Sequence, residues 1–380
     1  MAPGGIGRDS DSDRPTVCLA TRYNLGGLMR LLDVQISRAG PFAQVHFPFA
    51  DEEGAPRMMT VVHGGGGVGK TTLAAAIAST RPGHTILPQR ELTRGFSHTA
   101  PPVVVCSWKP GQDDPERPHP LVVATPNARL TDDDERETFR RREQALFDKL
   151  AREKGFVFVA IPATRWFSRQ PITLAAPSRS VGQYDVRAAT SFDDGVRADL
   201  ARETKQALAY AAIASALPAR PADAKPRFRL LGEAMRSAVN ALTRLVGYAY
   251  WGLDPLSFEP LFHAEGGGLI PFDAIPTRAR HLAAFAALPV RALAAAYPGE
   301  DPRQCEGVVV IDEVDMHQDP GVQLALAGAL RVAIPEVQWI LTTTSPKMAG
   351  ACDTRDVLAL RRTADFGQVQ LFTGFEARTH

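Results

Sequence analysis

The sequence has few cysteines, no excess of either charge and no long hydrophobic stretch. Its four cysteines, Cys18, Cys106, Cys305 and Cys352, are scattered without a CxxC pair. This spacing argues against a zinc module and is typical of a protein in a reducing compartment. Lys and Arg number 43 against 42 for Asp and Glu, so no overall positive field attracts nucleic acid. Any contact with DNA would need a local basic patch.

No apolar run reaches the length needed to cross a membrane, and the first residues contain no apolar core of a signal peptide. We therefore expect a cytoplasmic protein without a membrane partner. Residues 1–14 are rich in Gly, Ser and Asp, which predicts a disordered tail. The remaining chain, 15–380, is long enough for one large α/β domain with an insertion, or for two domains.

A glycine-rich stretch gives the strongest signal in the sequence. Residues 60–78 read TVVHGGGGVGKTTLAAAIA, and Gly64 to Thr71 fit the phosphate-binding pattern GxxxxGK[ST] at every fixed position. A β-branched run precedes the glycines and an Ala-rich apolar run follows them, which predicts the order strand, loop, helix that this motif requires. The predicted nucleotide-binding residues are Gly64, Gly65, Gly66, Gly67, Val68, Gly69, Lys70, Thr71 and Thr72.

Each side chain of the motif has a chemical role in this interpretation. The glycines let the main chain approach an anion, and Lys70 places its charge on the β- and γ-phosphates. Thr71 offers its hydroxyl to Mg²⁺. The alternative is a flexible glycine-rich turn before an ordinary helix. The flanking pattern favours ATP and Mg²⁺ as cofactors.

A second motif lies far downstream, where residues 307–316 read GVVVIDEVDM. An apolar strand ending in two acids has the form of a Walker B motif, in which Asp312 holds Mg²⁺ through water and Glu313 polarises the attacking water. The alternative is a buried strand that ends in a polar turn. Because no apolar run between Lys70 and Asp312 ends in Asp, we expect the intervening chain to hold an insertion, largely helical over 130–260.

Local patterns predict the other elements. Short antiparallel strands are expected at 17–23, 31–37 and 43–49, and buried strands at 102–107, 121–125 and 156–161. A helix is expected over 131–154, with Thr131 as its N-cap and Phe139, Leu146 and Leu150 on its buried face. Two further helices are expected at 191–217 and 230–251, separated by a proline-rich link at 218–226.

The final third of the chain resembles the ABC-type ATPase heads of the RecF, SMC and OLD group. In that group the Walker B strand runs into a pattern like DEPExHLHPxWQ, and residues 312–323 read DEVDMHQDPGVQ, with Asp319 at the position of the second His. Residues 337–346, VQWILTTTSP, are similar to the strand and switch turn written TTHSP, with Thr344 at the switch histidine. Residues 270–280, IPFDAIPTRAR, resemble the signature FDxLSSGER, with Thr277 for serine and Arg278 for glycine.

This resemblance implies an α/β P-loop NTPase with an ABC-type core sheet, an antiparallel N-terminal subdomain and a helical insertion. It implies catalytic roles for Lys70, Glu313 and Thr344, with Thr71 and Asp312 as metal ligands. It further implies a slow ATPase that acts as a switch in DNA maintenance or anti-phage defence. The implied partners are a second copy bound through the ATP sites, a protein encoded nearby, and DNA.

Several alternatives stay open from the sequence. The departures at Thr344 and Arg278 favour an ATP-binding scaffold with little turnover, and residues 276–280 also fit a plain helix start with solvated arginines. A transporter subunit is disfavoured by the divergent signature. Four glutamines, Gln89, Gln112, Gln170 and Gln183, fit the Q-loop of an ABC-type head equally well.

Overall fold

The computed structural model describes residues 29–81, 84–85, 100–109, 119–126, 128–153, 156–172, 199–217, 224–363 and 368–378. The expected tail at 1–14, the strand at 17–23 and Cys18 lie outside these residues, as do Gln89, Gln112 and Gln183. Cys106 and Cys305 are buried and Cys352 is partly buried, each as a free thiol.

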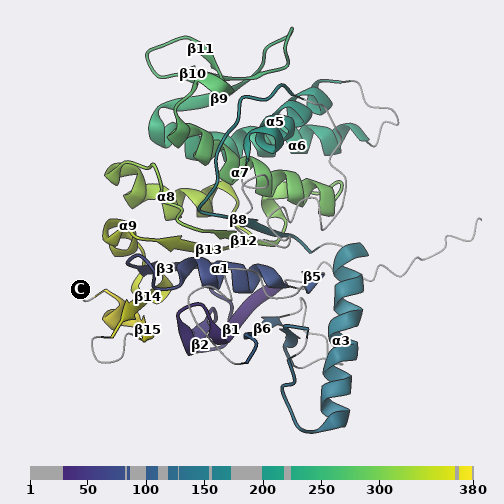
Figure 1. The fold of residues 1–380 in the computed structure, drawn as a ribbon. Coiled ribbons are helices and arrows are strands. Elements are labelled where there is room, and N and C mark those ends of the chain that lie inside the picture. The colour runs from purple at the N-terminus through teal and green to yellow at the C-terminus, as the bar shows by residue number, and fades with distance from the viewer. Residues whose placement is uncertain are drawn as a thin grey trace, which may run out of the picture.

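A six-stranded sheet forms the centre of the molecule (Figure 1). Its order is β15 (Val369–Thr373), β14 (Val357–Arg362), β3 (Met59–Gly64), β13 (Val337–Thr343), β12 (Gly307–Ile311) and β8 (Phe158–Ile161). All neighbouring strands are parallel except β14 and β15. Every residue of β8, β12 and β13 is buried. This explains the continuous apolar sequences of β8 and β12, because layers of structure cover both faces of the sheet.

One face of the core sheet is covered by helix α1 (Lys70–Ser79) and, beyond it, by a second sheet. That sheet is antiparallel, in the order β2 (Phe42–Pro48), β1 (Arg30–Ala39), β6 (Val103–Lys109) and β7 (Leu121–Ala124). Apart from Thr71, all of α1 is buried, because apolar side chains from both sheets enclose it. The short strands β4 (Thr80–Arg81) and β5 (His84–Thr85) follow α1.

The opposite face carries a helical layer (Figure 1). It consists of α5 (Ala201–Ala216), α6 (Ala224–Thr243), α7 (Thr277–Ala296), α8 (Pro320–Ala333) and the short α9 (Pro346–Ala351). Beyond α5 and α6 lies a small antiparallel sheet of β9 (Tyr248–Leu253), β10 (Pro260–Ala264) and β11 (Leu269–Pro271). None of the helices in the described part of the chain has the length and apolar character needed to span a membrane.

The structure corrects the helix expected at 131–154. Helix α3 spans Asp134–Glu153, and the Asp133 carboxylate caps it by accepting from the backbone N–H groups of Glu135 and Arg136, so Thr131 is not the N-cap. The expected buried face was also wrong. Phe139 and Leu146 are more than half exposed, whereas Phe147 and Ala151 are buried. The helix therefore packs through a face rotated from the expected one.

The helix expected at 230–251 ends early. Helix α6 stops at Thr243, a short 3-10 turn follows, and Gly247 has a φ of 79°, a left-handed conformation that ends the run. Residues 248–253 then form strand β9, consistent with the strand preference of aromatic side chains. The link expected at 218–226 is also shorter, because Pro226 lies within α6.

The fold class expected from the sequence is confirmed: a P-loop α/β fold with an ABC-type core sheet, an antiparallel N-terminal subdomain and helices placed between the two nucleotide motifs. Strand β8 falls within 130–260 yet belongs to the core sheet, paired with β12. The helices α5 and α6 are thus the part of this segment that adds a layer.

A buried cation fastens the helical layer to the small sheet. Lys205 of α5 is 1% exposed, and its ammonium lies 2.6 Å from Asp273 Oδ2 and 3.0 Å from Glu259 Oε1. It also donates to the Gln170 carbonyl oxygen at 2.9 Å.

Lys205→Met should therefore lower the free energy of unfolding by about 3 to 5 kcal/mol, because two carboxylates lose their shared partner. Urea unfolding measures this, and Arg229→Met, in an exposed pair with Glu233 on α6, is the matched control.

The deficit of Lys205→Met should shrink as the pH falls from 7 to 5. Burial raises the pKa of Glu259 above its ordinary value, with Lys205 opposing the rise. A carboxyl with a raised pKa binds its proton more tightly in the folded state, so acid stabilises that state relative to the unfolded one. Without Lys205 the pKa of Glu259 should rise further. Once Glu259 is protonated it is neutral, so the loss of the Lys205 ammonium then costs less stability. An equal deficit at both pH values would contradict this account.

Candidate functional site

The glycine loop and helix α1 form an anion-binding geometry. The loop follows β3 and leads into α1, whose N-cap is Gly69 with no side-chain cap and no acid in its first turn. The first backbone N–H groups of α1 therefore lack a side-chain acceptor and carry the positive end of the helix dipole. The Lys70 ammonium donates to the carbonyl oxygens of Gly64 and Gly65 at 2.9 and 2.8 Å, which folds its side chain over the loop.

Two of the loop glycines are required sterically. Gly69 has a φ of 99°, and a Cβ there would lie 2.4 Å from the Phe42 ring. A Cβ at Gly64 would lie 2.7 Å from the Leu360 carbonyl oxygen. Gly65 and Gly66 have open space around them, so the loop is free on the side away from the sheet.

Thr72 and Val68 support the loop from behind. Both side chains are buried, and that of Thr72 lies against Gly40 in the turn between β1 and β2. Their side chains therefore position the loop, leaving any contact with a ligand to their backbone groups.

The two sequence motifs meet at Asp312. The Thr71 hydroxyl donates to Asp312 Oδ2 at 2.6 Å, although 241 positions separate the two residues. The Thr342 hydroxyl donates to Asp312 Oδ1 at 2.5 Å and accepts from the backbone N–H of Glu313 at 2.8 Å. Asp312 is fully buried. The neighbouring β3, β12 and β13 are parallel, so their carboxyl ends bring the P-loop, Asp312 and Thr342 to one edge of the sheet.

Arg165 holds the same turn and was missed by the sequence analysis. It follows β8, the strand beside β12, and is 4% exposed. Its guanidinium donates to the carbonyl oxygens of Asp312 and Glu313, both at 2.6 Å, and of Pro162 at 3.0 Å. It also lies over the ring of Phe285 on α7. No local pattern marks this arginine, because its partners are backbone atoms on another strand.

Three acids surround the loop lysine. Burial lowers the pKa of Lys70, and the carboxylates of Glu313, Asp312 and Asp315 oppose this change. Asp315 is buried, and its Oδ1 has no hydrogen-bond partner within the described chain.

Glu313 has a φ of 46°, which is uncommon for a residue other than glycine. Its backbone is held there by Thr342 on one side and Arg165 on the other.

The oxygen atoms at this edge suit Mg²⁺. Thr71 and Asp312 offer a hydroxyl and a carboxylate side by side, and hard cations prefer such ligands. Among the described residues, no group of three or more His, Cys, Asp or Glu could hold a metal by itself. Mg²⁺ in phosphate sites keeps several waters and uses one or two protein ligands plus the phosphates, so a small protein donor set fits it.

A histidine on the neighbouring strand lies beside the switch turn, and the sequence analysis did not consider it. Thr344 is exposed at the end of β13, as expected for a residue at the site. His63 of β3 is the register partner of Thr343, so its imidazole belongs to the same sheet edge. Burial and the neighbouring Lys70 lower the pKa of His63. Its ring is therefore neutral at pH 7 and able to accept a hydrogen bond. It was missed because it precedes the P-loop instead of ending β13.

Gln323 joins the Walker B segment to the switch turn. Its amide nitrogen donates to the Gln318 carbonyl oxygen at 2.8 Å, and its amide oxygen accepts from the Ser345 hydroxyl at 2.7 Å. Ser345 in turn caps α9 by accepting from the Met348 N–H. Gln323 thus connects the two segments through hydrogen bonds to both.

Two of the departures from the family pattern, Arg278 and Asp319, contact each other. Arg278, in the first turn of α7, forms an ion pair with Asp319 just after the Walker B segment. The Gln318 amide donates to the Arg278 carbonyl oxygen at 3.3 Å. His281 of α7 also stacks on His317, with 5.2 Å between ring centroids. A helix does start in this segment, as the alternative interpretation of 276–280 expected, because α7 begins at Thr277. Arg278 is not a freely solvated side chain, however, since it is paired with Asp319.

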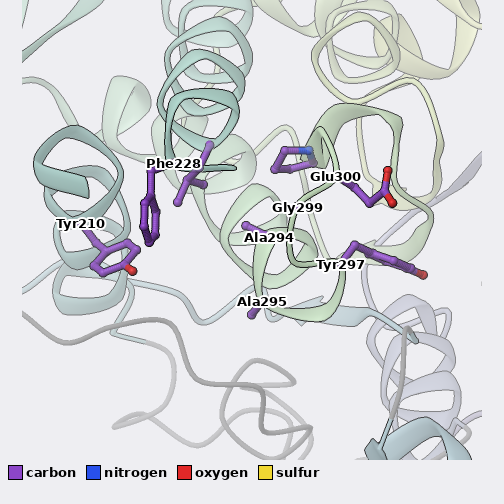
Figure 2. Close-up of a pocket in the computed structure, with 9 residues that line it drawn as sticks. Tyr210, Phe228, Ala294, Ala295, Tyr297, Gly299 and Glu300 are labelled. Carbon is purple, nitrogen blue, oxygen red and sulfur yellow. The ribbon is translucent and has the colours of Figure 1, made fainter. Parts of the chain in front are cut away.

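A separate hollow lies at the other end of α7. It is open to solvent, with Ala294, Ala295 and Pro302 in its lining. The rings of Tyr210 and Phe228 lie on one side, while Tyr297 and Glu300 point away from them (Figure 2). No set of charged groups converges there, so the hollow does not compete with the P-loop as the nucleotide site.

Gln170, the one described Q-loop candidate, is exposed, and its carbonyl oxygen accepts from Lys205.

The glycine loop between β3 and α1 and its junction with Asp312 define a P-loop α/β fold. Three solved structures are similar over most of their length. The Smc head bound to the C-winged helix domain of ScpA is 13% identical, with a TM-score of 0.48 and 90% of this chain and 98% of that chain covered. The SMC head domain from Thermotoga maritima is 14% identical, with a TM-score of 0.42 and coverage of 91% and 99%. The third, from Pyrococcus furiosus, is an Smc head domain with an extended coiled coil bound to the C-terminal domain of ScpA.

That third structure is 11% identical, with a TM-score of 0.47 and coverage of 91% and 97%. With TM-scores below 0.5, this likeness adds nothing to the fold and site described above. No protein-family model and no curated protein sequence matches the chain.

Arg165→Lys should destabilise the Walker B turn. A single ammonium cannot reach three carbonyl oxygens in the fork geometry of a guanidinium, and buried acceptors would lose their donors. We expect the free energy of unfolding to fall by about 2 to 4 kcal/mol, since each such bond to a charged group contributes roughly 1.5 to 3 kcal/mol. Urea unfolding measures this loss. Arg355→Lys, in an exposed pair with Asp353, is the control and should leave the unfolding midpoint unchanged.

Proposed function

We propose that this protein is an ABC-type switch that binds Mg·ATP and hydrolyses it slowly. The proposal rests on one observation above all, the 2.6 Å hydrogen bond between the P-loop hydroxyl of Thr71 and the Walker B carboxylate of Asp312. A glycine-rich turn before an ordinary helix would have no reason to lie against a buried acid 241 positions away. Binding of phosphates and of a metal explains why the two segments meet.

The chain would neutralise phosphate charge from the P-loop side. Backbone N–H groups of the loop and the first turn of α1 would bind the phosphate oxygens, and Lys70 would exchange its two carbonyl acceptors for the β- and γ-phosphates. Partial burial makes this exchange favourable, because a desolvated ammonium is poorly satisfied by neutral carbonyls.

Thr71 and Asp312 would hold Mg²⁺, which supplies Lewis-acid polarisation of the phosphoryl oxygens when bound. Glu313 would orient the water that attacks the γ-phosphorus. Its unusual backbone conformation supports this role, since Thr342 and Arg165 fix the turn and thereby the direction in which the carboxylate leaves it. Thr344 and His63 lie at the same edge, where either could contact the γ-phosphate.

An ATP-binding scaffold with little turnover is the second candidate function. The ion pair between Arg278 and Asp319 favours it, because Arg278 occupies the place where a glycine would allow a second subunit's nucleotide to approach. Tied to Asp319, the arginine side chain lies along its own subunit.

The biological role proposed here follows the resemblance of the motifs. A cytoplasmic switch in DNA maintenance or anti-phage defence would dimerise through its ATP sites and act with a protein encoded nearby, with DNA as a further partner. The domain limits, a single ATPase domain over 15–380 with a largely helical insertion over 130–260, belong to the same proposal.

Lys70→Ala should weaken Mg·ATP binding at least tenfold while leaving the fold intact. The substitution removes a charge-assisted contact of roughly 1.5 to 3 kcal/mol. Calorimetric titration with ATP measures the loss, and a matching thermal transition shows that the variant is folded. Unchanged affinity for Mg·ATP in the folded variant would show that the P-loop is not part of the ATP-binding site.

Glu313→Gln should bind ATP with nearly wild-type affinity and stop hydrolysis, since the amide keeps the shape of the side chain but not its charge. If ATP favours a closed dimer, blocked hydrolysis should make that state persist. Light scattering after size exclusion, with and without Mg·ATP, should show the variant gaining mass with nucleotide. ATP binding at constant mass would favour the scaffold instead.

A further inference from the structure

The small sheet of β9, β10 and β11 forms one extremity of the molecule, on the far side of α5 and α6 from the core sheet (Figure 1). We call residues 248–271 the tip. Its inner face is part of the main core, where Tyr250 and Phe262 pack against each other and are buried. Its outer face carries Leu261, His263 and Leu269 at alternate positions, and the last two are exposed. The tip thus has an apolar outer surface without a covering layer among the described residues.

A β-bulge turns Trp251 outward. Leu261 pairs with Gly252 and Phe262 pairs with Tyr250, so Trp251 is the extra residue of β9. Bulges re-aim side chains and bend the strand locally. The Trp251 side chain is 60% exposed while its neighbour Tyr250 is buried.

The turn between β9 and β10 presents two more apolar side chains on a rigid support. Asp254 Oδ1 accepts from the N–H groups of Leu256 and Ser257 and from the Ser257 hydroxyl, at 3.0, 2.8 and 2.9 Å. Leu256 is held at the apex of this turn with 92% exposure. Phe258 has a φ of 57° and an exposed ring. A turn this well bonded cannot easily fold Leu256 back, so it is preorganised for contact.

The free edge of β9 is closed to another strand. The Arg236 guanidinium of α6 donates to the Trp251 carbonyl oxygen at 2.7 Å, and the Asn240 side chain accepts from the Tyr250 N–H at 2.6 Å. A strand adding to this edge would have to displace both side chains. Contact must therefore be made through side chains on the outer face and the turn.

The charge of the tip restricts its occupant. Residues 245–277 contain no Lys or Arg but four acids, Asp254, Glu259, Glu265 and Asp273. Two cations from the helices lie against the tip and both are engaged: Lys205 pairs with Glu259 and Asp273, and Arg236 binds the Trp251 carbonyl oxygen. Asp254 and Glu265 are left beside the apolar surface. Acids repel DNA and anionic lipid surfaces, and a second tip would bring like charges together. A basic partner is the chemistry that complements them.

We propose that the tip docks an amphipathic, basic helix of a protein partner. The apolar face of that helix packs on Trp251, Leu256 and Phe258, and its Lys or Arg side chains lie near Asp254 and Glu265. Rigid, exposed apolar side chains ringed by charge are typical of such anchors. The site is separate from the P-loop, and it adjoins the start of α7, because β11 leads through Phe272–Ala274 into that helix.

A synthetic amphipathic helix of leucine and lysine, labelled with a fluorophore, tests the proposal on the full chain. Fluorescence anisotropy should show saturable binding, and the same peptide with glutamate in place of each lysine should bind at least tenfold more weakly. The double variant Trp251→Ser, Leu256→Ser should lose at least tenfold in affinity for the lysine peptide. The control Leu324→Ser, at a residue of α8 that is 55% exposed, should bind as wild type.

Three outcomes would overturn the proposal. The first is that the double variant and the wild type bind the lysine peptide with equal affinity, while their thermal transitions show that both are folded. The second is binding of duplex DNA or anionic vesicles that the double variant abolishes, which would assign the surface to a phosphate-bearing partner. The third is a mass increase with protein concentration that the double variant removes, which would make the occupant a second copy of this chain. A variant that keeps ATP binding but loses the peptide separates this site from the nucleotide site.

Discussion

The buried carboxylate of Asp312 is the constraint on which the site depends. A charge removed from water must be paired or hydrogen-bonded, and here the hydroxyls of Thr71 and Thr342 bind its two oxygens. Those contacts tie the P-loop helix, the Walker B turn and β13 together. Arg165 completes the arrangement by binding the carbonyl oxygens at the same turn, so that a cation and an anion are buried within one network. The geometry around Glu313 follows from this network.

Contacts from this network reach the exposed parts of the molecule. Gln323 joins the Walker B segment to the switch turn, and the Arg278–Asp319 pair joins it to the start of α7. Helix α7 then continues the chain from the tip, which presents Leu256 on a rigid turn. The proposed nucleotide site at one sheet edge and the proposed docking surface at the far end of the helical layer are thus joined by continuous structure.

The sequence by itself determined the two motifs and much of the fold. GxxxxGK[ST] specifies a loop and a helix start because only glycine allows the close approaches seen at Gly64 and Gly69. The unbroken apolar runs of β8 and β12 specify strands covered on both faces. Local patterns failed where the periodicity allowed more than one face, as in α3, and where aromatic residues suited either a helix or a strand, as at 248–251.

Only the tertiary structure decided which residues meet. The 2.6 Å contact of Thr71 with Asp312 and the bonds of Arg165 to backbone carbonyls join positions more than a hundred residues apart, which no local pattern encodes. Arg278 and Asp319, which depart from the family pattern in two different segments, form an ion pair with each other. His63 joined the switch edge through the register of β3 with β13. For Thr71, Arg165 and His63 the physical reason is that strand order and register, which depend on packing of the whole sheet, set the distances. For Arg278 and Asp319 it is the placement of the start of α7 beside the N-cap of α8.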